Sequence, residues 1–192
     1  ISCRVDAERW MTMPVTSPTL VTIDNIEINA IEGSTENWKA HPAIYQECPH
    51  VGGVVHVHPP HVVAFSTLGE AFVPVHHYGA PFHGRLATFA SPGQTKSDDR
   101  ARDLARQLGT NRAILQRGHG VITVGKDLRE AVLLVLFLEE AVKTNMLAMQ
   151  MGKPKLLTPE QSEKITPQIL KQRSQDKAWD HYVSKTKLKG FL

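Results

Sequence analysis

The stretch VGGVVHVHPP, residues 51–60, decides how the sequence is organised. Its β-branched residues predict a strand over Val51–Val57, and the two prolines that follow His58 end it. Side chains alternate between the two faces of a strand, so His56 and His58 lie on the same face. Their imidazoles can converge on one ion where the strand stops. Two half-buried polar residues would produce the same pattern, so the pair alone does not establish a metal site.

The segments around this strand mix helix and strand patterns. Upstream, Ile1–Ile31 has strand-and-loop character, and Ser34 offers the N-cap of a helix that reaches Cys48 with Pro42 inside it. Downstream we expect four strands, over Phe72–Val75, Leu86–Phe89, Ala113–Leu115 and Gly120–Val124. We expect a short helix over His61–Leu68, and further helices from Ser97 to Leu108, from Asp127 to about Met151 and after Thr158. This order predicts α/β or α+β layers around one sheet.

Composition predicts a single domain over residues 1–192, because 41% hydrophobic residues can fill one core. The net charge is only +3 and no basic stripe is interleaved with aromatic residues, so we expect no nucleic-acid partner. The longest apolar run, Ala131–Leu138, is too short for a membrane span. Two cysteines are too few for a disulfide framework, which favours a cytoplasmic location. The chain begins at Ile1 without a signal-peptide pattern, and we expect native residues upstream of it.

Histidine is the unusual component. The chain has ten, and seven of them lie between His50 and His83, which indicates a metal or acid–base site. His119 supplies a third candidate ligand beside His56 and His58, because the glycines on both sides of it allow a tight turn and leave room for the imidazole. Three neutral histidines with an open fourth position are typical of a catalytic divalent metal. Nitrogen ligands without thiolate suit Zn, Mn, Fe or Co, and the sequence does not choose between these metals.

These residues resemble the class II aldolase/adducin family. The motifs that carry the resemblance are His56-x-His58-Pro59, the Arg117-Gly-His119-Gly turn, HPAIY at 41–45, VGGVVH at 51–56 and Leu138-Glu139. The resemblance covers nearly the whole chain. The resemblance implies an α/β/α three-layer sandwich with a mainly antiparallel central sheet. It also implies a divalent metal on His56, His58 and His119, and a homotetramer with its active site near a subunit interface.

The family includes sugar-phosphate aldolases, epimerases, decarboxylases and the non-enzymatic adducin heads. Its enzymes share the formation of a carbanion that a divalent metal stabilises through a neighbouring oxygen. Adducin heads lack the full histidine set, which this chain has, so the resemblance favours a metal-dependent lyase. A non-catalytic, adducin-like assembly module remains the alternative from another class of protein.

Phosphosugar chemistry is the first enzymatic alternative, with a fuculose-phosphate aldolase or an epimerase as the model. Such enzymes use a glutamate four residues before the helix histidine, but four residues before His41 is Asn37, and Glu36 is one position away. Either Glu36 is the base or the enzyme does not need one. Ser34 and Thr35 match the family's second phosphate-contacting pair, whereas the glycine-containing phosphate loop has no counterpart near residues 12–17.

Other motifs resemble the decarboxylase branch, which acts on hydroxylated aromatic or pyridine carboxylic acids. They are CRVD at 3–6, SPTLVT at 17–22 and HYGAP at 77–81. Decarboxylation needs no proton-abstracting carboxylate but does need an acid that protonates carbon, and Tyr78 or His77 is the candidate.

A small anionic substrate would be bound by several polar side chains. Arg4 and Arg117 are candidate carboxylate clamps, because guanidinium binds carboxylate bidentately. His61, one helical turn beyond His58, is a candidate for orienting the substrate or a metal ligand. Near the C-terminus, packing is the expected role of Trp179, and Tyr182 is a weaker site candidate.

Overall fold

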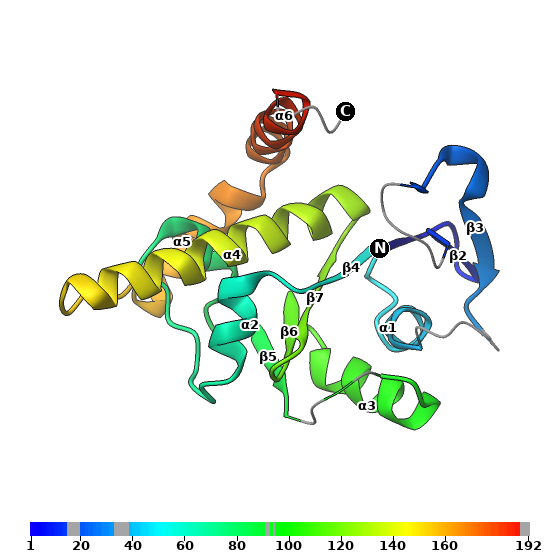
Figure 1. Cartoon of the computed structure of the whole chain (residues 1–192), viewed down its shortest axis with the longest axis horizontal. Coiled ribbons are helices and arrows are strands. Elements are labelled where there is room, and N and C mark those ends of the chain that lie inside the picture. The colour runs from blue at the N-terminus through cyan, green and yellow to red at the C-terminus, as the bar shows by residue number, and fades with distance from the viewer. Residues whose placement is uncertain (15–19, 33–38, 91–92, 94, 189–192) are drawn as a thin grey trace.

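The computed structural model describes residues 1–192 except for 15–19, 33–38, 91, 92, 94 and 189–192, and its described parts form three layers (Figure 1). The middle layer is a seven-stranded sheet with the order β3-β2-β1-β4-β7-β6-β5. The strands are β1 Ser2–Arg4, β2 Arg9–Thr12, β3 Glu27–Ala30, β4 Gly53–Val57, β5 Leu86–Phe89, β6 Ala113–Gln116 and β7 Gly120–Gly125. Neighbouring strands are antiparallel except β5 and β6, which are parallel. The predicted three-layer fold with a mainly antiparallel sheet is confirmed.

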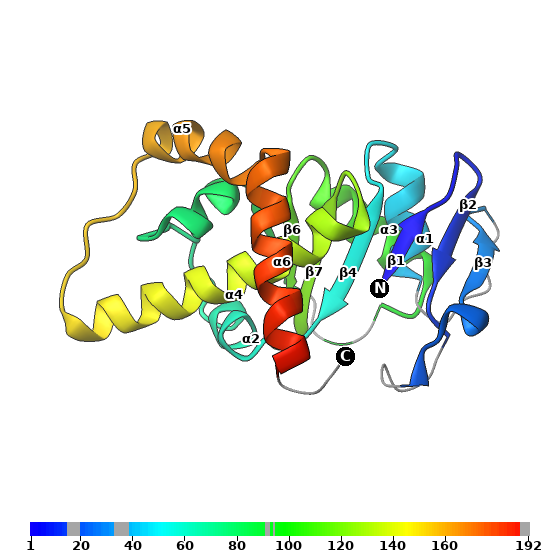
Figure 2. The same ribbon diagram turned by 90° about the horizontal axis from the view of Figure 1, so that it is seen from above.

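Helices cover both faces of the sheet. They are α1 Ala40–Glu47, α2 Pro60–Ser66, α3 Asp98–Leu108, α4 Leu128–Met151, α5 Pro159–Leu170 and α6 Gln172–Leu188, with 3₁₀ segments η2 Ile23–Asn25 and η3 His77–Phe82. α1 and α3 form one outer layer, while α2 and α4 lie on the opposite face of the sheet (Figures 1 and 2). α6 packs on α4, and α5 packs on η3 and α6. Of the helices in the described parts of the chain, none combines the length and the apolar character that crossing a bilayer requires.

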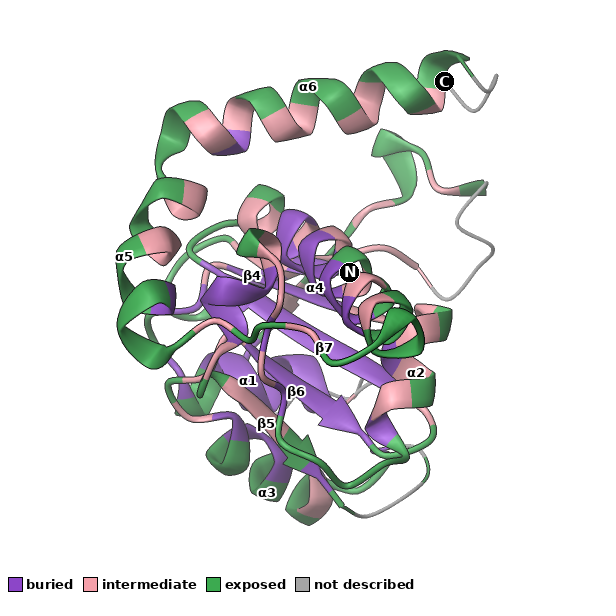
Figure 3. Ribbon diagram, turned by 90° about the vertical axis from the view of Figure 1, so that its left-hand side faces the viewer, coloured by how far each residue is buried: buried purple, intermediate pink, exposed green. Residues whose placement is uncertain are grey.

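Apolar cores separate these layers on both faces of the sheet, and two of these cores are large. The first joins α1 and α3 to strands β2, β4, β6 and β7, with Trp10 and Ile44 among its fully buried side chains. The second joins α2, α4 and η3 to β6 and β7, and includes Phe82 and Phe137. Figure 3 shows the buried residues on the central strands and on the helix faces that meet them. β6 and β7 are buried along their whole length, which places both strands between the two cores.

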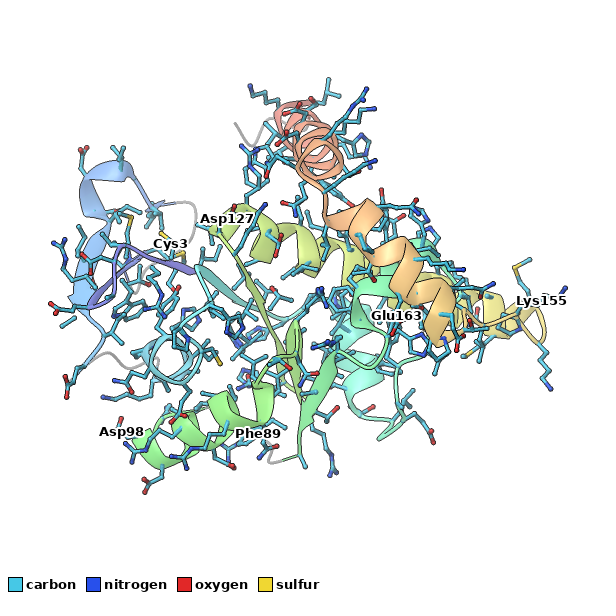
Figure 4. The ribbon with its side chains drawn as sticks, turned by 180° about the vertical axis from the view of Figure 1, so that it is seen from behind. Cys3, Phe89, Asp98, Asp127, Lys155 and Glu163 are labelled. Carbon is cyan, nitrogen blue, oxygen red and sulfur yellow. The ribbon has the colours of Figure 1, made fainter. Side chains whose placement is uncertain are left out.

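The expected helix starts are confirmed for α3, α4 and α5. The Ser97 hydroxyl accepts a hydrogen bond from Arg100 N at 3.4 Å, and the Asp127 carboxylate accepts one from Glu130 N at 2.8 Å. Thr158 and Gln161 form a reciprocal capping box. Asp127 can be seen at the start of α4 in Figure 4. Each cap supplies an acceptor to backbone N–H groups that have no partner inside their own helix.

Two local expectations are changed by the structure. Pro42 lies in the first turn of α1, where its missing N–H would have no intrahelical acceptor, and the helix continues through it. The start predicted for this helix at Ser34 lies outside the described residues. The strand predicted over Phe72–Val75 is wrong, because the Asn145 side chain on α4 donates to Val73 O and accepts from Val75 N. These bonds take up backbone groups that a strand would use in a ladder.

The C-terminal part of the chain contains one more helix than the sequence predicted. α5 ends at Leu170, and α6 runs from Gln172 to Leu188. Figure 2 shows α6 lying across α4. α6 and α4 are joined by two contacts. The buried side chain of Gln175 donates to Glu130 on α4 at 2.6 Å, and Arg129 forms an ion pair with Asp176. The packing role expected for Trp179 agrees with its position against the second core.

Candidate metal centre

The register of two central strands brings the three candidate ligands together. β4 pairs with β7 so that His56 lies opposite Ile122 and Val57 lies opposite Val121. The carboxyl end of β4 therefore meets the amino end of β7. His58 follows the last residue of β4, and His119 precedes the first residue of β7. The histidine cluster, which we define as His56, His58 and His119, is a direct result of this antiparallel pairing.

Distances within the histidine cluster suit a single divalent ion. One ligand atom from each of the three side chains lies within 4.8 Å of the other two. His56 Nε2 is 3.0 Å from His58 Nε2, and the ring centroids are 4.8 to 5.1 Å apart. Nitrogen ligands at tetrahedral angles and about 2.1 Å from zinc are themselves about 3.4 Å apart. His58 is exposed, so the cluster is open to solvent on its side.

The turn that carries His119 depends on both of its flanking glycines. Gly118 has a φ of +66°, a conformation that glycine adopts without strain. At Gly120 an added Cβ would lie 2.5 Å from His58 Cδ2 and 2.6 Å from Val57 O, so no larger residue fits. The turn is held from outside by Ser66 at the end of α2, whose hydroxyl accepts a hydrogen bond from Gly118 N at 2.9 Å. Backbone approach and helix packing together position the imidazole.

Electrostatics favour the neutral, metal-binding form of these imidazoles. Burial lowers the pKa of His56 to about 3, with further lowering from His58 and His119. Burial and the neighbouring His58 also lower the pKa of His119. Protonated imidazoles at this separation would repel one another, whereas neutral ones present lone pairs. The donor chemistry of the histidine cluster therefore fits a divalent metal, and nitrogen ligands without thiolate suit Zn, Mn, Fe or Co.

His61 is anchored by a carboxylate that the sequence analysis assigned no role. Its Nδ1 is 2.5 Å from Glu139 Oε1, and Glu139 also accepts hydrogen bonds from His61 N and Val62 N. Glu139 therefore caps the amino end of α2 from the neighbouring helix α4. Its signal in the sequence is its place in the Leu138-Glu139 motif, which does not identify the partner.

Tyr78 and His77 lie away from the histidine cluster within one chain. The Tyr78 ring stacks on Phe137 with centroids 4.5 Å apart. Tyr78, His77 and Phe137 line a cavity of about 520 Å³ between η3, α4, α5 and α6, which we call the α6 cavity. No ligand histidine lines it. Burial, followed by the nearby Glu140 carboxylate, raises the pKa of Tyr78, so its phenol stays protonated at neutral pH.

The two predicted carboxylate clamps differ in position. Arg4 N donates to Gly52 O, at the opposite end of β4 from His58. Six residues of extended chain place the backbones of Gly52 and His58 about 20 Å apart. The Arg4 guanidinium donates to Val51 O and Tyr45 O, which ties β1 to α1. Arg117 is exposed in the same turn as His119. Only Arg117 is therefore placed near the histidine cluster of its own chain.

Four further site predictions fall in a segment that the structure leaves undescribed. They are Ser34, Thr35, Glu36 and Asn37, within residues 33–38. Which of Glu36 and Asn37 occupies the glutamate position therefore stays a prediction.

Comparison with known proteins identifies one sequence family. Residues 5–146 match the class II aldolase and adducin N-terminal domain. The chain is 30% identical over 135 residues to a 5-methylthioribulose-1-phosphate/5-deoxyribulose-1-phosphate aldolase of Rhodospirillum rubrum, a match that covers 68% of this chain and 59% of the relative. It is 28% identical over 151 residues to the decarboxylase NovR of Streptomyces niveus, covering 76% and 56%. The chain thus spans less than two thirds of these relatives.

Two further matches extend over almost the whole chain. A 3,4-dihydroxyphthalate decarboxylase of Terrabacter is 24% identical over 199 aligned positions, covering 96% of this chain and 82% of the relative. The crystal structure of an aldolase II superfamily protein from Pseudomonas syringae has a TM-score of 0.80 at 21% identity, covering 99% of this chain and 83% of that one. At this identity the structural match supports the fold alone.

Proposed function

The chain belongs to the class II aldolase and adducin family, and from this premise we propose that it is a divalent-metal-dependent carbon–carbon lyase that decarboxylates a hydroxylated aromatic or pyridine carboxylic acid. The observation that carries the proposal is the convergence of His56, His58 and His119 with one side open to solvent. A structural site would use four protein ligands, whereas three ligands leave a position for substrate.

The three histidines would hold Zn or Mn, with Fe or Co as alternatives. When bound, such a metal supplies a Lewis acid that stabilises negative charge developing on a substrate oxygen. Arg117, in the same turn as His119, is our candidate for binding the substrate carboxylate. His61 would orient the substrate, because Glu139 fixes the direction of its ring through Nδ1.

Decarboxylation fits the residues better than proton abstraction does. The bond between the ring carbon and the carboxylate breaks, carbon dioxide leaves, and the electron pair remains on carbon until a proton arrives. Tyr78 is our candidate donor because its phenol, with a raised pKa, holds its proton at neutral pH, and the adjacent His77 is the alternative. The relatives whose names denote decarboxylases support this assignment.

Because Tyr78 lies in the α6 cavity, away from the histidine cluster of its own chain, the proton would come from another subunit. We therefore propose that the active protein is a homo-oligomer, a tetramer by analogy with the family, located in the cytoplasm. One subunit would contribute the metal ligands and its neighbour the proton donor. The substrate would be a small anion, with neither nucleic acid nor membrane involved.

Elemental analysis and paired activity assays test the proposal. We expect one divalent metal per chain and release of carbon dioxide from 3,4-dihydroxyphthalate or a hydroxypyridine dicarboxylate. Cleavage of phosphosugars without any release of carbon dioxide would overturn it. A metal content far below one per chain, together with unchanged behaviour of His119→Ala, would instead indicate a non-catalytic module like the adducin heads.

A second candidate function is a phosphosugar aldolase or epimerase, which the 30% identity to the Rhodospirillum aldolase favours. In that case Glu36 would abstract the proton, with Ser34, Thr35 and Asn37 contacting substrate and phosphate. Glu36→Gln separates the two functions. It should abolish aldol cleavage and leave decarboxylation unchanged, because loss of carbon dioxide requires no carboxylate base.

A further inference from the structure

The α6 cavity has an aromatic wall and a basic wall. Its volume of about 520 Å³ is in the range of small-molecule sites. The aromatic wall consists of Tyr78, whose ring stacks on the buried Phe137, and of Tyr182 on α6. Aromatic faces of this kind favour a flat ligand ring, which can stack on them.

The basic wall lies on α6. Lys177, His181 and Lys185 are spaced four residues apart, so they form one row along the helix, and all three line the cavity. Ammonium groups on flexible stems can close on a carboxylate placed at the cavity mouth. Their expected ligand group is therefore an anion.

One acidic side chain faces this basic row. Glu140 on α4 lines the same cavity and accepts a hydrogen bond from the Tyr182 hydroxyl at 3.4 Å. Burial and Glu140 raise the pKa of Tyr182 to about 12, so this phenol remains a donor. The exposed Glu140 carboxylate has two oxygens with several lone pairs, so it can accept a second hydrogen bond besides the one from Tyr182. A ligand hydroxyl is a suitable donor for it, whereas a ligand with acceptors alone would be repelled.

We propose that the α6 cavity binds a hydroxylated aromatic carboxylate, with its ring beside Tyr78 and Tyr182, a carboxylate on Lys177 and Lys185, and a hydroxyl on Glu140. The choice of ligand class rests on the proposed function. The residues that would recognise its polar groups, Lys177, Lys185 and Glu140, have no part in the proposed reaction, and the cavity assignment rests on their positions alone.

Calorimetric titration of the full-length chain with 3-hydroxybenzoate tests the proposal. The hydroxyl and carboxylate of this probe are too far apart on the ring to chelate one metal ion. We expect saturable binding that is tighter than that of benzoate, which lacks the hydroxyl, and of phenol, which lacks the carboxylate. The double variant Lys177→Gln/Lys185→Gln should raise the Kd about tenfold or more, since two charge-assisted contacts are lost.

Three further variants locate the probe. Lys187→Gln, on the same helix but outside the cavity, should leave the Kd unchanged. Glu140→Gln should reduce the preference for 3-hydroxybenzoate over benzoate. His119→Ala should bind the probe like the parent chain. Binding that is lost in His119→Ala, or that is unaffected in the double lysine variant, would overturn the proposal.

The binding titration and the carbon dioxide release assay together separate this inference from the proposed function. Lysine-dependent binding without any release of carbon dioxide would leave the cavity assignment standing and reject the decarboxylase. Release of carbon dioxide with no lysine-dependent binding would do the reverse.

Discussion

The histidine cluster and the α6 cavity are held by different kinds of structure. The cluster lies where β4 ends and its partner strand β7 begins. Its members span 64 residues of sequence, from His56 to His119. The α6 cavity is walled by η3, α4, α5 and α6, which are held together by helix packing and not by the pairing of strands. Backbone pairing limits the positions of the histidines closely, whereas helix packing leaves the cavity walls free to adjust. We therefore expect substitutions to damage the two regions by different mechanisms.

Removing one of the three proposed metal ligands should have the largest effect. His119→Ala leaves two of three imidazoles, and we expect bound metal to fall well below one per chain and carbon dioxide release to fall on the order of a thousandfold. Elemental analysis and the gas-release assay measure both. His50→Ala, an exposed histidine outside the cluster, is the matched control and should behave like the parent chain. Equal losses in both variants would show that the cluster has no special role.

Gly120→Ala tests whether the strand pairing positions the ligands. The added methyl would overlap His58 and the Val57 carbonyl, so we expect the free energy of unfolding to fall by about 2 kcal/mol and metal binding to weaken. Urea denaturation and metal titration provide the readouts. Gly69→Ala is the control: Gly69 has a φ of +72° and open space around it, so the strain should cost about 1 kcal/mol without changing metal affinity. Unchanged metal affinity in Gly120→Ala would contradict the close approach described here.

Glu139→Ala tests the link between α2 and α4. It removes the acceptor for His61 N, His61 Nδ1 and Val62 N, and we expect a loss of about 2 kcal/mol in unfolding free energy. Its neighbour Glu140 is exposed and bonds only to Tyr182 among the described residues, so Glu140→Ala should change stability by less than about 0.5 kcal/mol. Similar losses in the two variants, measured by urea denaturation, would rule out a specific cap.

The smallest effect should come from the titration of Tyr182, which changes the unfolding free energy only at alkaline pH. Because the folded chain raises the pKa of Tyr182 from 10 to about 12, the unfolded chain loses this proton first as the pH rises. The stability contributed by the neutral phenol is thus fully present below pH 10 and is lost between pH 10 and about pH 12. Ultraviolet titration of tyrosinate and unfolding at pH 9 and 11 measure this. Tyr182→Phe should flatten the dependence, and a Tyr182 that titrates near pH 10 would contradict the burial described.

The histidine cluster could be predicted because each of its parts has a local cause. The two-residue period of a strand places His56 and His58 on one face, and the glycines beside His119 indicate a tight turn. The helix starts at Ser97, Asp127 and Thr158 were predictable for the same reason, since a cap lies within a few residues of the N–H groups it serves. Ligands supplied by short segments of known geometry need little information from the rest of the fold.

The strand predicted over Phe72–Val75 failed because its backbone groups bond to Asn145, about 70 residues later. Glu139 and Glu140 show the same limit in adjacent positions. One turns toward α2 and caps it, while the other faces α6 and Tyr182. Nothing in the residues around them distinguishes these partners, because helix packing sets the direction of each side chain.

The amino-acid sequence by itself determined the candidate metal ligands through strand periodicity and turn chemistry, and its motifs carried the resemblance that implied the family and the three-layer fold. Only the tertiary structure decided that the Arg4 guanidinium is taken up by Val51 O and Tyr45 O, that Glu139 holds His61, and that Tyr78 shares a cavity with Lys177 and Lys185 on α6. These placements depend on contacts between distant segments, and such contacts are fixed by the packing of whole helices and strands.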